Sequence, residues 1–242
     1  MRSSRVHRSA AGAAALAAVT FIGLACAPPP PPPTTTTTTS TTTSSSTTTT
    51  SIPPSPIGLV INEIDYDQVG TDTAEFVELK NTSSSTLDLT GTDLVFVNGA
   101  SSVVYRTVPL GGVGLVAPGA YVVVGDAPVT SALPAGTASI TMPGFDNIQN
   151  GAPDAVTIVD NNHTSIIDSV SYEGSVLAAV LPGFVGTVSL DEGYPHTDPL
   201  GPSDSNVFEA SLSRFPDGSD TNDERVDWVL SSTPTPGAVN FA

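Results

Sequence analysis

Short apolar runs separated by Gly, Pro, Asn and Asp fill the chain from residue 57 onward and predict an all-β fold. Residues 59–66 alternate, with Val60, Ile64 and Tyr66 on one parity and acidic side chains on the other, so we expect one buried and one solvated face. Residues 121–124 are apolar on both parities, as in a strand covered on both sides. Helices should be scarce, because this region sustains no 3.6-residue apolar period. Further strands are expected at 75–81, 93–97, 103–108, 155–160, 165–173, 208–215 and 226–230.

A different pattern occupies the start of the chain, which has the features of an export signal. A basic segment at residues 1–8 precedes the apolar run of residues 10–24, and Ala25 and Cys26 follow. That apolar run is shorter than the roughly 20 residues of a membrane-spanning helix. We therefore interpret residues 1–25 as a removable signal peptide.

Cys26 is the only cysteine of the chain, and Gly23-Leu24-Ala25-Cys26 resembles a bacterial lipobox. The resemblance implies that Cys26 carries acyl chains, which hold a protein on a membrane. Ordinary signal cleavage after Ala27 is the alternative, because Ala25 and Ala27 are both small. We favour lipidation of Cys26, because a lone exposed thiol in an exported chain is prone to oxidation.

Residues 26–56 should form a disordered tether. Residues 28–33 are all proline and residues 34–50 are all Thr or Ser, and such a composition has too little apolar area to fold. About thirty residues of this kind would span on the order of 90 Å if fully extended. We expect a spacer that holds a domain away from a membrane, the alternative being a low-complexity tail without a spacing role.

The charge balance excludes one class of partner. The chain has 7 Lys and Arg against 24 Asp and Glu, which gives a formal net charge of −17, and three of its cations lie in the signal peptide. A body this acidic repels phosphate instead of releasing its counterions, so we expect no nucleic-acid partner. Cationic partners and divalent ions are favoured instead.

Catalytic residues are hard to find in this sequence. His163 lies among Asn and Asp in a predicted hairpin turn, where an exposed polar side chain is expected. Residues 111–114 are rich in glycine but lack the other residues of a phosphate-binding loop, so we expect a hairpin turn there too. His196 and Asp198 would need two further ligands to hold zinc. We therefore expect that the protein is not an enzyme.

Calcium is the one ligand that the residue spacing suggests. Residues 217–224 place oxygen-bearing side chains at alternating positions in a loop that contains a glycine, which suits a hard cation. A solvated turn after a strand is the alternative, and we favour the turn over a calcium cofactor. A second acidic loop contains Asp65, Asp67 and Asp72. The candidate ligands of the first loop are Asp217, Ser219, Asp220, Asn222 and Asp223.

A series of motifs follows along the chain in this order: Ile61-Asn62-Glu63-Ile64, Ala74-Glu75-Phe76-Val77-Glu78-Leu79-Lys80-Asn81, Leu87-Asp88-Leu89-Thr90-Gly91, Leu115-Val116-Ala117-Pro118-Gly119-Ala120-Tyr121-Val122, Asn150-Gly151-Ala152-Pro153-Asp154-Ala155-Val156, Ile167-Asp168-Ser169-Val170-Ser171-Tyr172, Ser211-Leu212-Ser213-Arg214-Phe215-Pro216-Asp217-Gly218 and Thr235-Pro236-Gly237-Ala238-Val239-Asn240. Together they resemble the lamin-tail domain family. The resemblance implies an immunoglobulin-like β-sandwich with long loops over residues 57–242, without an inter-sheet disulfide because a second cysteine is lacking. Residues 175–207 fall outside the match, and we interpret them as an insertion.

The resemblance also guides the functional prediction, because bacterial lamin-tail domains look like attachment or recognition modules. We predict an exported, extracytoplasmic lipoprotein, anchored to the cell membrane through Cys26. It would present the sandwich, without catalysis, to a protein or glycan of the envelope or act as a scaffold. Loops near 126–153 and 175–207 offer the largest surfaces. The alternative is an exported hydrolase with an acidic site in the 175–207 insertion, formed by Asp191, Glu192 and His196.

Overall fold

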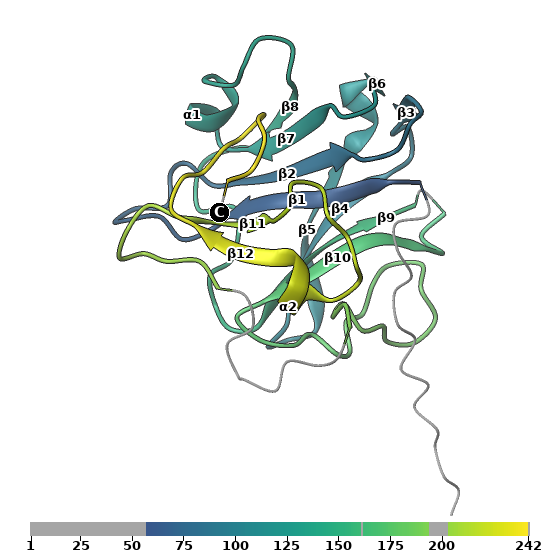
Figure 1. Ribbon diagram of the computed structural model, residues 1–242. Helices are drawn as coiled ribbons and strands as arrows, with labels where there is room; N and C mark the ends of the chain where they lie inside the picture. Colours follow the sequence, from purple (N-terminus) through teal and green to yellow (C-terminus); the bar gives the residue numbers. More distant parts are fainter. Residues whose placement is uncertain (1–56, 161, 194–202, 242) are drawn as a thin grey trace, which may run out of the picture. The chain divides into compact units, whose positions relative to one another are not determined.

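The computed structural model describes residues 57–160, 162–193 and 203–241, which fold into two packed β-sheets (Figure 1). One sheet has six strands in the order β12-β11-β1-β2-β7-β8, and the other has four in the order β10-β9-β4-β5. Neighbouring strands are antiparallel, except that β7 and β8 are parallel. This arrangement confirms the all-β class and the immunoglobulin-like sandwich that the resemblance implies.

The strands follow the apolar runs of the sequence. The six-stranded sheet contains β1 (Leu59–Asp65), β2 (Phe76–Asn81), β7 (Tyr121–Gly125), β8 (Ala138–Thr141), β11 (Ser211–Arg214) and β12 (Trp228–Ser231). The four-stranded sheet contains β4 (Asp93–Asn98), β5 (Val103–Pro109), β9 (Asp154–Val159) and β10 (Ile166–Tyr172). A small third sheet pairs β3 (Leu87–Asp88) with β6 (Leu115–Val116).

Helix is as scarce as predicted. The described residues contain the one-turn helices α1 (Ala127–Thr130) and α2 (Glu224–Asp227) and the 3₁₀ helix η1 (Leu110–Val113). None of the helices among these residues has the length and apolar character needed to cross a membrane.

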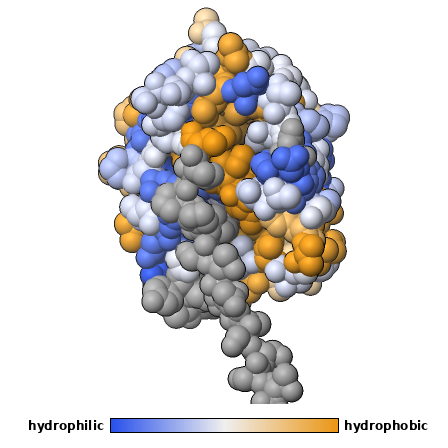
Figure 2. All heavy atoms as spheres, turned by 90° about the vertical axis from the view of Figure 1, so that its right-hand side faces the viewer, coloured by the Kyte–Doolittle hydropathy of each residue, from blue (hydrophilic) through white to orange (hydrophobic). Residues whose placement is uncertain are grey.

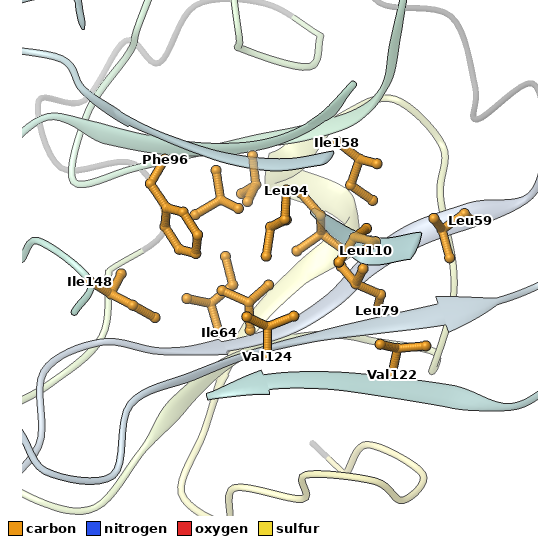
Figure 3. Packing of buried hydrophobic residues seen from close by; sticks show 14 of the residues in the cluster. Leu59, Ile64, Leu79, Leu94, Phe96, Leu110, Val122, Val124, Ile148 and Ile158 are labelled. Atoms are coloured by element: carbon orange, nitrogen blue, oxygen red, sulfur yellow. The ribbon is translucent and has the colours of Figure 1, made fainter. Parts of the chain in front are cut away.

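The main core lies between the two sheets (Figure 3). Ile64, Leu79 and Val124 of the six-stranded sheet face Leu94 and Phe96 of the four-stranded sheet, and all five side chains are fully buried. Aliphatic and aromatic side chains pack well on a pleated surface, so two such faces placed together exclude water. This core sets the positions of the strand ends and loops that carry the polar clusters.

A second, smaller core covers the outer face of the four-stranded sheet. Its sheet residues pack against side chains from residues 176–190, which belong to the predicted insertion. Val180 N donates to Ser102 O at 2.8 Å, so this segment is also hydrogen-bonded next to the edge of β5. Residues 175–193 of the predicted insertion are thus packed on the sandwich. The buried members of this core are Val95, Val97, Ala155, Val159, Val176, Ala179, Leu181 and Leu190.

The prediction of a solvated face on the first strand is wrong. All seven residues of β1 are buried, Glu63 and Asp65 included. The Glu63 carboxylate accepts hydrogen bonds from Ser211 Oγ at 2.5 Å and from Thr235 N at 2.9 Å. The acidic face of β1 is therefore covered by β11 and by the C-terminal segment of the chain, which takes the place of water.

Two further predictions of local structure are also wrong. Residues 111–114 do not form a hairpin turn, because Leu110 is buried in the main core and holds the following residues in η1. The predicted strand 226–230 begins instead with α2, because the side chain of Asp223 accepts a hydrogen bond from Arg225 N and caps that helix. The first difference comes from packing in the distant core, and the second from a local helix cap.

Candidate functional site

Arg214, the last residue of β11, lies fully buried among four carboxylates. Its Nη2 donates to Asp168 Oδ1 at 3.1 Å and to Glu192 Oε2 at 3.3 Å. Its Nη1 donates to Asp227 Oδ2 at 3.2 Å and lies 3.6 Å from Asp220 Oδ1. Because Asp168 belongs to β10, this contact joins the two sheets through a buried ion pair.

Backbone oxygens and one aromatic ring complete the surroundings of this guanidinium. Nε donates to Ile61 O at 2.7 Å, and Nη1 donates to Ser219 O at 3.0 Å. The guanidinium carbon lies 5.1 Å from the centroid of the Trp228 ring, which adds a cation–π contact. The five N–H donors of Arg214 are thereby all matched to acceptors within the chain. We interpret the cluster as a structural cross-link, since it leaves no donor of Arg214 for a ligand.

The Arg214 cluster nevertheless contains more acidic groups than basic ones. Burial raises the pKa of Glu192 well above its usual range, and the neighbouring Asp168 carboxylate raises it further. Burial also raises the pKa of Asp168, while the Arg214 charge acts in the opposite direction. Both shifts favour the protonated forms of these two carboxyl groups, which lessens the excess negative charge around the guanidinium.

Asp217, the first residue of the predicted calcium loop, has partners in the six-stranded sheet. Its Oδ1 accepts from Asn62 Nδ2 at 2.8 Å, and its Oδ2 accepts from Tyr121 OH at 2.9 Å and from Lys80 Nζ. Burial alone would raise the pKa of Asp217, but the hydrogen bonds from Lys80, Asn62 and Tyr121 hold it below its usual value. Asp217 thus ties the loop to β1, β2 and β7.

The other side chains of that loop point to different partners. Asp223 caps α2 and pairs with Arg225 Nη2 at 2.8 Å, whereas Asp220 faces the Arg214 guanidinium. Asn222 N donates to Asp220 Oδ1 at 3.2 Å. The acidic residues among the candidate ligands therefore lie beside three separate cations, as expected for a turn that fastens the loop to the sandwich.

Three acidic side chains close enough to share one ion occur twice among the described residues. One group is Asp168, Glu192 and Asp220, which surrounds Arg214, and the other lies between the β1–β2 and β8–β9 connections. Neither group contains Asp217 or Asp223. A calcium site formed by residues 217–223 stays a prediction.

Two residues of the alternative hydrolase site have hydrogen-bond partners inside the fold, one in the backbone and the other in the Arg214 cluster. Asp191 is buried, and its Oδ1 accepts from Val176 N at 2.8 Å. Glu192 is buried beside Arg214 and Asp168. His196 lies outside the described residues. The two carboxyl groups that the structure describes therefore have structural partners.

His163 lies in the turn between β9 and β10, as the sequence predicts, but its side chain is half-buried and not exposed. Its Nδ1 lies 2.9 Å from Pro182 O, and its Nε2 lies 3.0 Å from Asp93 Oδ2. Pro182 offers only a carbonyl oxygen there, so Nδ1 carries the proton and donates. The hydrogen bonds to Asp93 and to Pro182 raise the pKa of His163. This side chain links the β9–β10 turn to β4 and to the segment on the outer face.

The closing motif of the chain, residues 235–240, covers the polar face of β1 and β2. Gly237 N donates to Glu78 Oε2 at 2.6 Å, and Thr235 N donates to Glu63 at 2.9 Å. Asn240 Nδ2 donates both to Asn62 O at 2.9 Å and to Arg214 O at 3.1 Å. The C-terminal segment thus supplies the donors that the buried acids and carbonyl oxygens of β1, β2 and β11 require.

We expect Asn240→Ala to lower the free energy of unfolding by about 1–3 kcal/mol, because two buried carbonyl oxygens lose their shared donor. Urea unfolding of the variant and the unaltered chain measures this difference. Asn162→Ala, at an exposed position of the β9–β10 turn, is the matched control and should change little. Equal midpoints for Asn240→Ala and the unaltered chain would contradict this role of the C-terminal segment.

Comparison with known proteins places this sandwich in a family. A family model, Lamin Tail Domain, matches residues 53–174, which is half of the chain and includes every strand from β1 to β10. No curated protein matches the chain. Lamin tail domains are non-enzymatic, immunoglobulin-like domains suited to binding or scaffolding. The chain belongs to the lamin tail domain family.

Proposed function

We propose that this protein is a non-catalytic lipoprotein of the cell surface. Acyl chains on Cys26 hold it on the extracytoplasmic side of the membrane, residues 26–56 act as the spacer, and the lamin-tail sandwich is presented outward. The sandwich binds a protein or glycan of the envelope or serves as a scaffold. The observation that carries the proposal is the order of segments, in which a signal-like start leads to one cysteine, a Pro/Thr/Ser run and then one domain.

The surface of the sandwich supports a binding role. Strand β8 lies at one edge of the six-stranded sheet, where unpaired backbone groups can accept an added strand. Figure 2 shows apolar side chains gathered in a band on the side of the sandwich on which β3 and β6 lie in Figure 1. Leu115 of β6 is 72% exposed. An edge strand and apolar surface are features that protein partners use.

The same geometry gives less support to the hydrolase alternative. A general acid or nucleophile must reach its substrate, but Asp191 and Glu192 are buried and hydrogen-bonded within the fold. Membership in a family of non-enzymatic domains agrees with a binding role. We therefore propose that the domain binds a partner without catalysing a reaction on it.

We expect Cys26→Ser to move the protein from the membrane fraction to the medium, because the thiol that would carry the acyl chains is removed. Fractionation of cells that express each form, together with labelling by a fatty-acid analogue, measures this change. Ala27→Ser is the matched control, since it alters the neighbouring residue but keeps the thiol. The proposal fails if Cys26→Ser stays in the membrane fraction or if the unaltered chain incorporates no fatty acid.

A further inference from the structure

A second acidic group lies where the β1–β2 and β8–β9 connections meet. Asp72 and Glu75 come from the first connection and Asp146 from the second, and one carboxylate oxygen from each lies within 4.8 Å of the others. Asp146 N also donates to Asp72 O at 3.2 Å, which holds the two connections together. Glu75 is fully buried, Asp72 is half-buried, and Asp146 is exposed. The group therefore opens to solvent on one side and ends at a buried carboxylate on the other.

The buried end of this group contains oxygens that lack a donor. Glu75 Oε2 accepts hydrogen bonds from Asn147 N and from Ile148 N, the latter at 3.1 Å, but Glu75 Oε1 has no hydrogen-bond partner. Asn147 is 2% exposed, and its Nδ2 donates to Asp126 Oδ1 at 2.6 Å, whereas its Oδ1 has no partner. Buried acceptors are normally satisfied by a donor or by a cation. An unpartnered oxygen of Glu75, and another on Asn147, the residue that follows Asp146, point to a positively charged ligand.

The ion pairs that the structure describes around the group do not neutralise its carboxylates. Among the ion pairs of the described residues, none joins Asp72, Glu75 or Asp146 to a basic side chain. The Arg214 cluster has a guanidinium at its centre. In this group the described residues place Arg106 only at the backbone, where its Nε donates to Asn147 O at 3.2 Å.

We propose that Asp72, Glu75 and Asp146 bind one calcium ion, with Asn147 Oδ1 as a further ligand. Calcium takes six to eight oxygen ligands at about 2.3–2.6 Å, so opposite ligands of one ion lie roughly 4.6–5.2 Å apart. Three oxygens within 4.8 Å of one another fit inside that sphere. Magnesium demands a near-ideal octahedron and retains its water, so ligands drawn from two irregular loops suit calcium better.

This site differs from both acidic loops that the sequence suggests. Asp65 Oδ1 accepts from Gln68 Nε2, and Asp67 lies 3.5 Å from Asn150 Nδ2, so of the three acidic residues predicted in that loop Asp72 alone belongs to the group. Of the other two carboxylate ligands, Glu75 directly precedes β2 and Asp146 lies in the β8–β9 connection. Calcium would therefore fasten two loops at one end of the sandwich.

Calcium titration of the full chain by calorimetry, with thermal unfolding measured in parallel, tests the proposal. We expect a single binding site and a melting temperature that rises by several degrees in millimolar calcium, because the ion binds only the folded state. Asp146→Asn should lower the calcium affinity tenfold or more, since it removes one ligand charge at an exposed position where the fold is not at risk. Glu75→Gln should abolish the rise.

The melting temperature without calcium separates lost binding from lost folding. In Glu75→Gln the amide oxygen still accepts from the Asn147 and Ile148 N–H groups, while the carboxyl that would bind calcium is replaced by a neutral amide. In a chelator, we therefore expect this variant to melt at the same temperature as the unaltered chain or higher. Added calcium should not change its melting temperature. If it fails to fold, Asp146→Asn carries the test alone.

Two control variants make the test specific. Asp88→Asn removes one exposed charge from β3, outside both connections, and should leave the calcium response unchanged. Asp220→Asn alters the predicted loop at 217–223 and should also leave it unchanged. The proposal is overturned if calcium gives neither heat nor a thermal shift, if Asp88→Asn loses as much affinity as Asp146→Asn, or if Asp220→Asn alone abolishes binding. None of these outcomes depends on membrane anchoring, so the proposed function is tested separately.

Discussion

Arg214→Met is expected to cost the domain about 3–5 kcal/mol of unfolding free energy, because it leaves buried carboxylates without their cation. The loss should shrink in acid, because protonation of Asp168 and Glu192 removes negative charge that the guanidinium balances in the unaltered chain. Urea unfolding at pH 5 and at pH 8, followed by circular dichroism, measures both effects.

Arg225→Met is the matched control for that experiment. The Arg225 side chain is 47% exposed and pairs with Asp223 at 2.8 Å. Exposed pairs of this kind contribute roughly 0–1 kcal/mol. A variant of Arg214 that unfolds at the same urea concentration as the Arg225 variant would show that the buried cluster is not the cross-link we describe.

The stability of the domain is expected to fall by several kcal/mol as the pH rises from 5 to 8, measured in a chelator. Burial raises the pKa of Asp65 and Glu75 to about 8 and of Asp154 and Asp204 to about 7. In the unfolded chain the same groups ionise near pH 4, so the folded state binds more protons between about pH 4 and 8. This stabilisation is complete below about pH 4 and is lost as the pH rises through 7 and 8.

Differential scanning calorimetry at constant ionic strength checks the direction of the effect. Asp65→Asn, which keeps an oxygen acceptor for Gln68 Nε2, should flatten the profile. Asp217, with its lowered pKa, contributes in the opposite sense but only below about pH 4. A melting temperature that stays constant or rises between pH 5 and 8 would show that these acids are ionised in the folded state.

The local pattern of the sequence predicts the strands well but says little about what covers them. The predicted strands at residues 121–124 and 93–97 are confirmed. Short apolar runs between turn residues are typical of strands in an all-β domain. The acidic side chains at alternate positions of β1 predict a face in contact with water. In the structure, however, Ser211 and Thr235 donate hydrogen bonds to Glu63 on that face. An alternating pattern shows that two faces differ, but it does not distinguish water from a hydrogen-bonding segment of the same chain.

The polar clusters are harder to predict, because their members are distant in the sequence. Arg214 appears in the sequence only as part of a family motif, while its partner Asp168 lies 46 residues earlier. Glu75 and Asn147 are 72 residues apart. One signal was available: basic residues are scarce in this acidic chain, so each is expected to have a buried or paired role.

The position of β1 has a consequence for how the protein is made. Strand β1 lies inside the six-stranded sheet, where β2 pairs with one edge and β11 with the other. Residues 211–214 leave the ribosome long after residues 59–65, so one edge of the nascent strand stays open until residues 211–214 have emerged. Premature termination before residue 211 would leave that open edge in the released product, where proteases and aggregation would act on it.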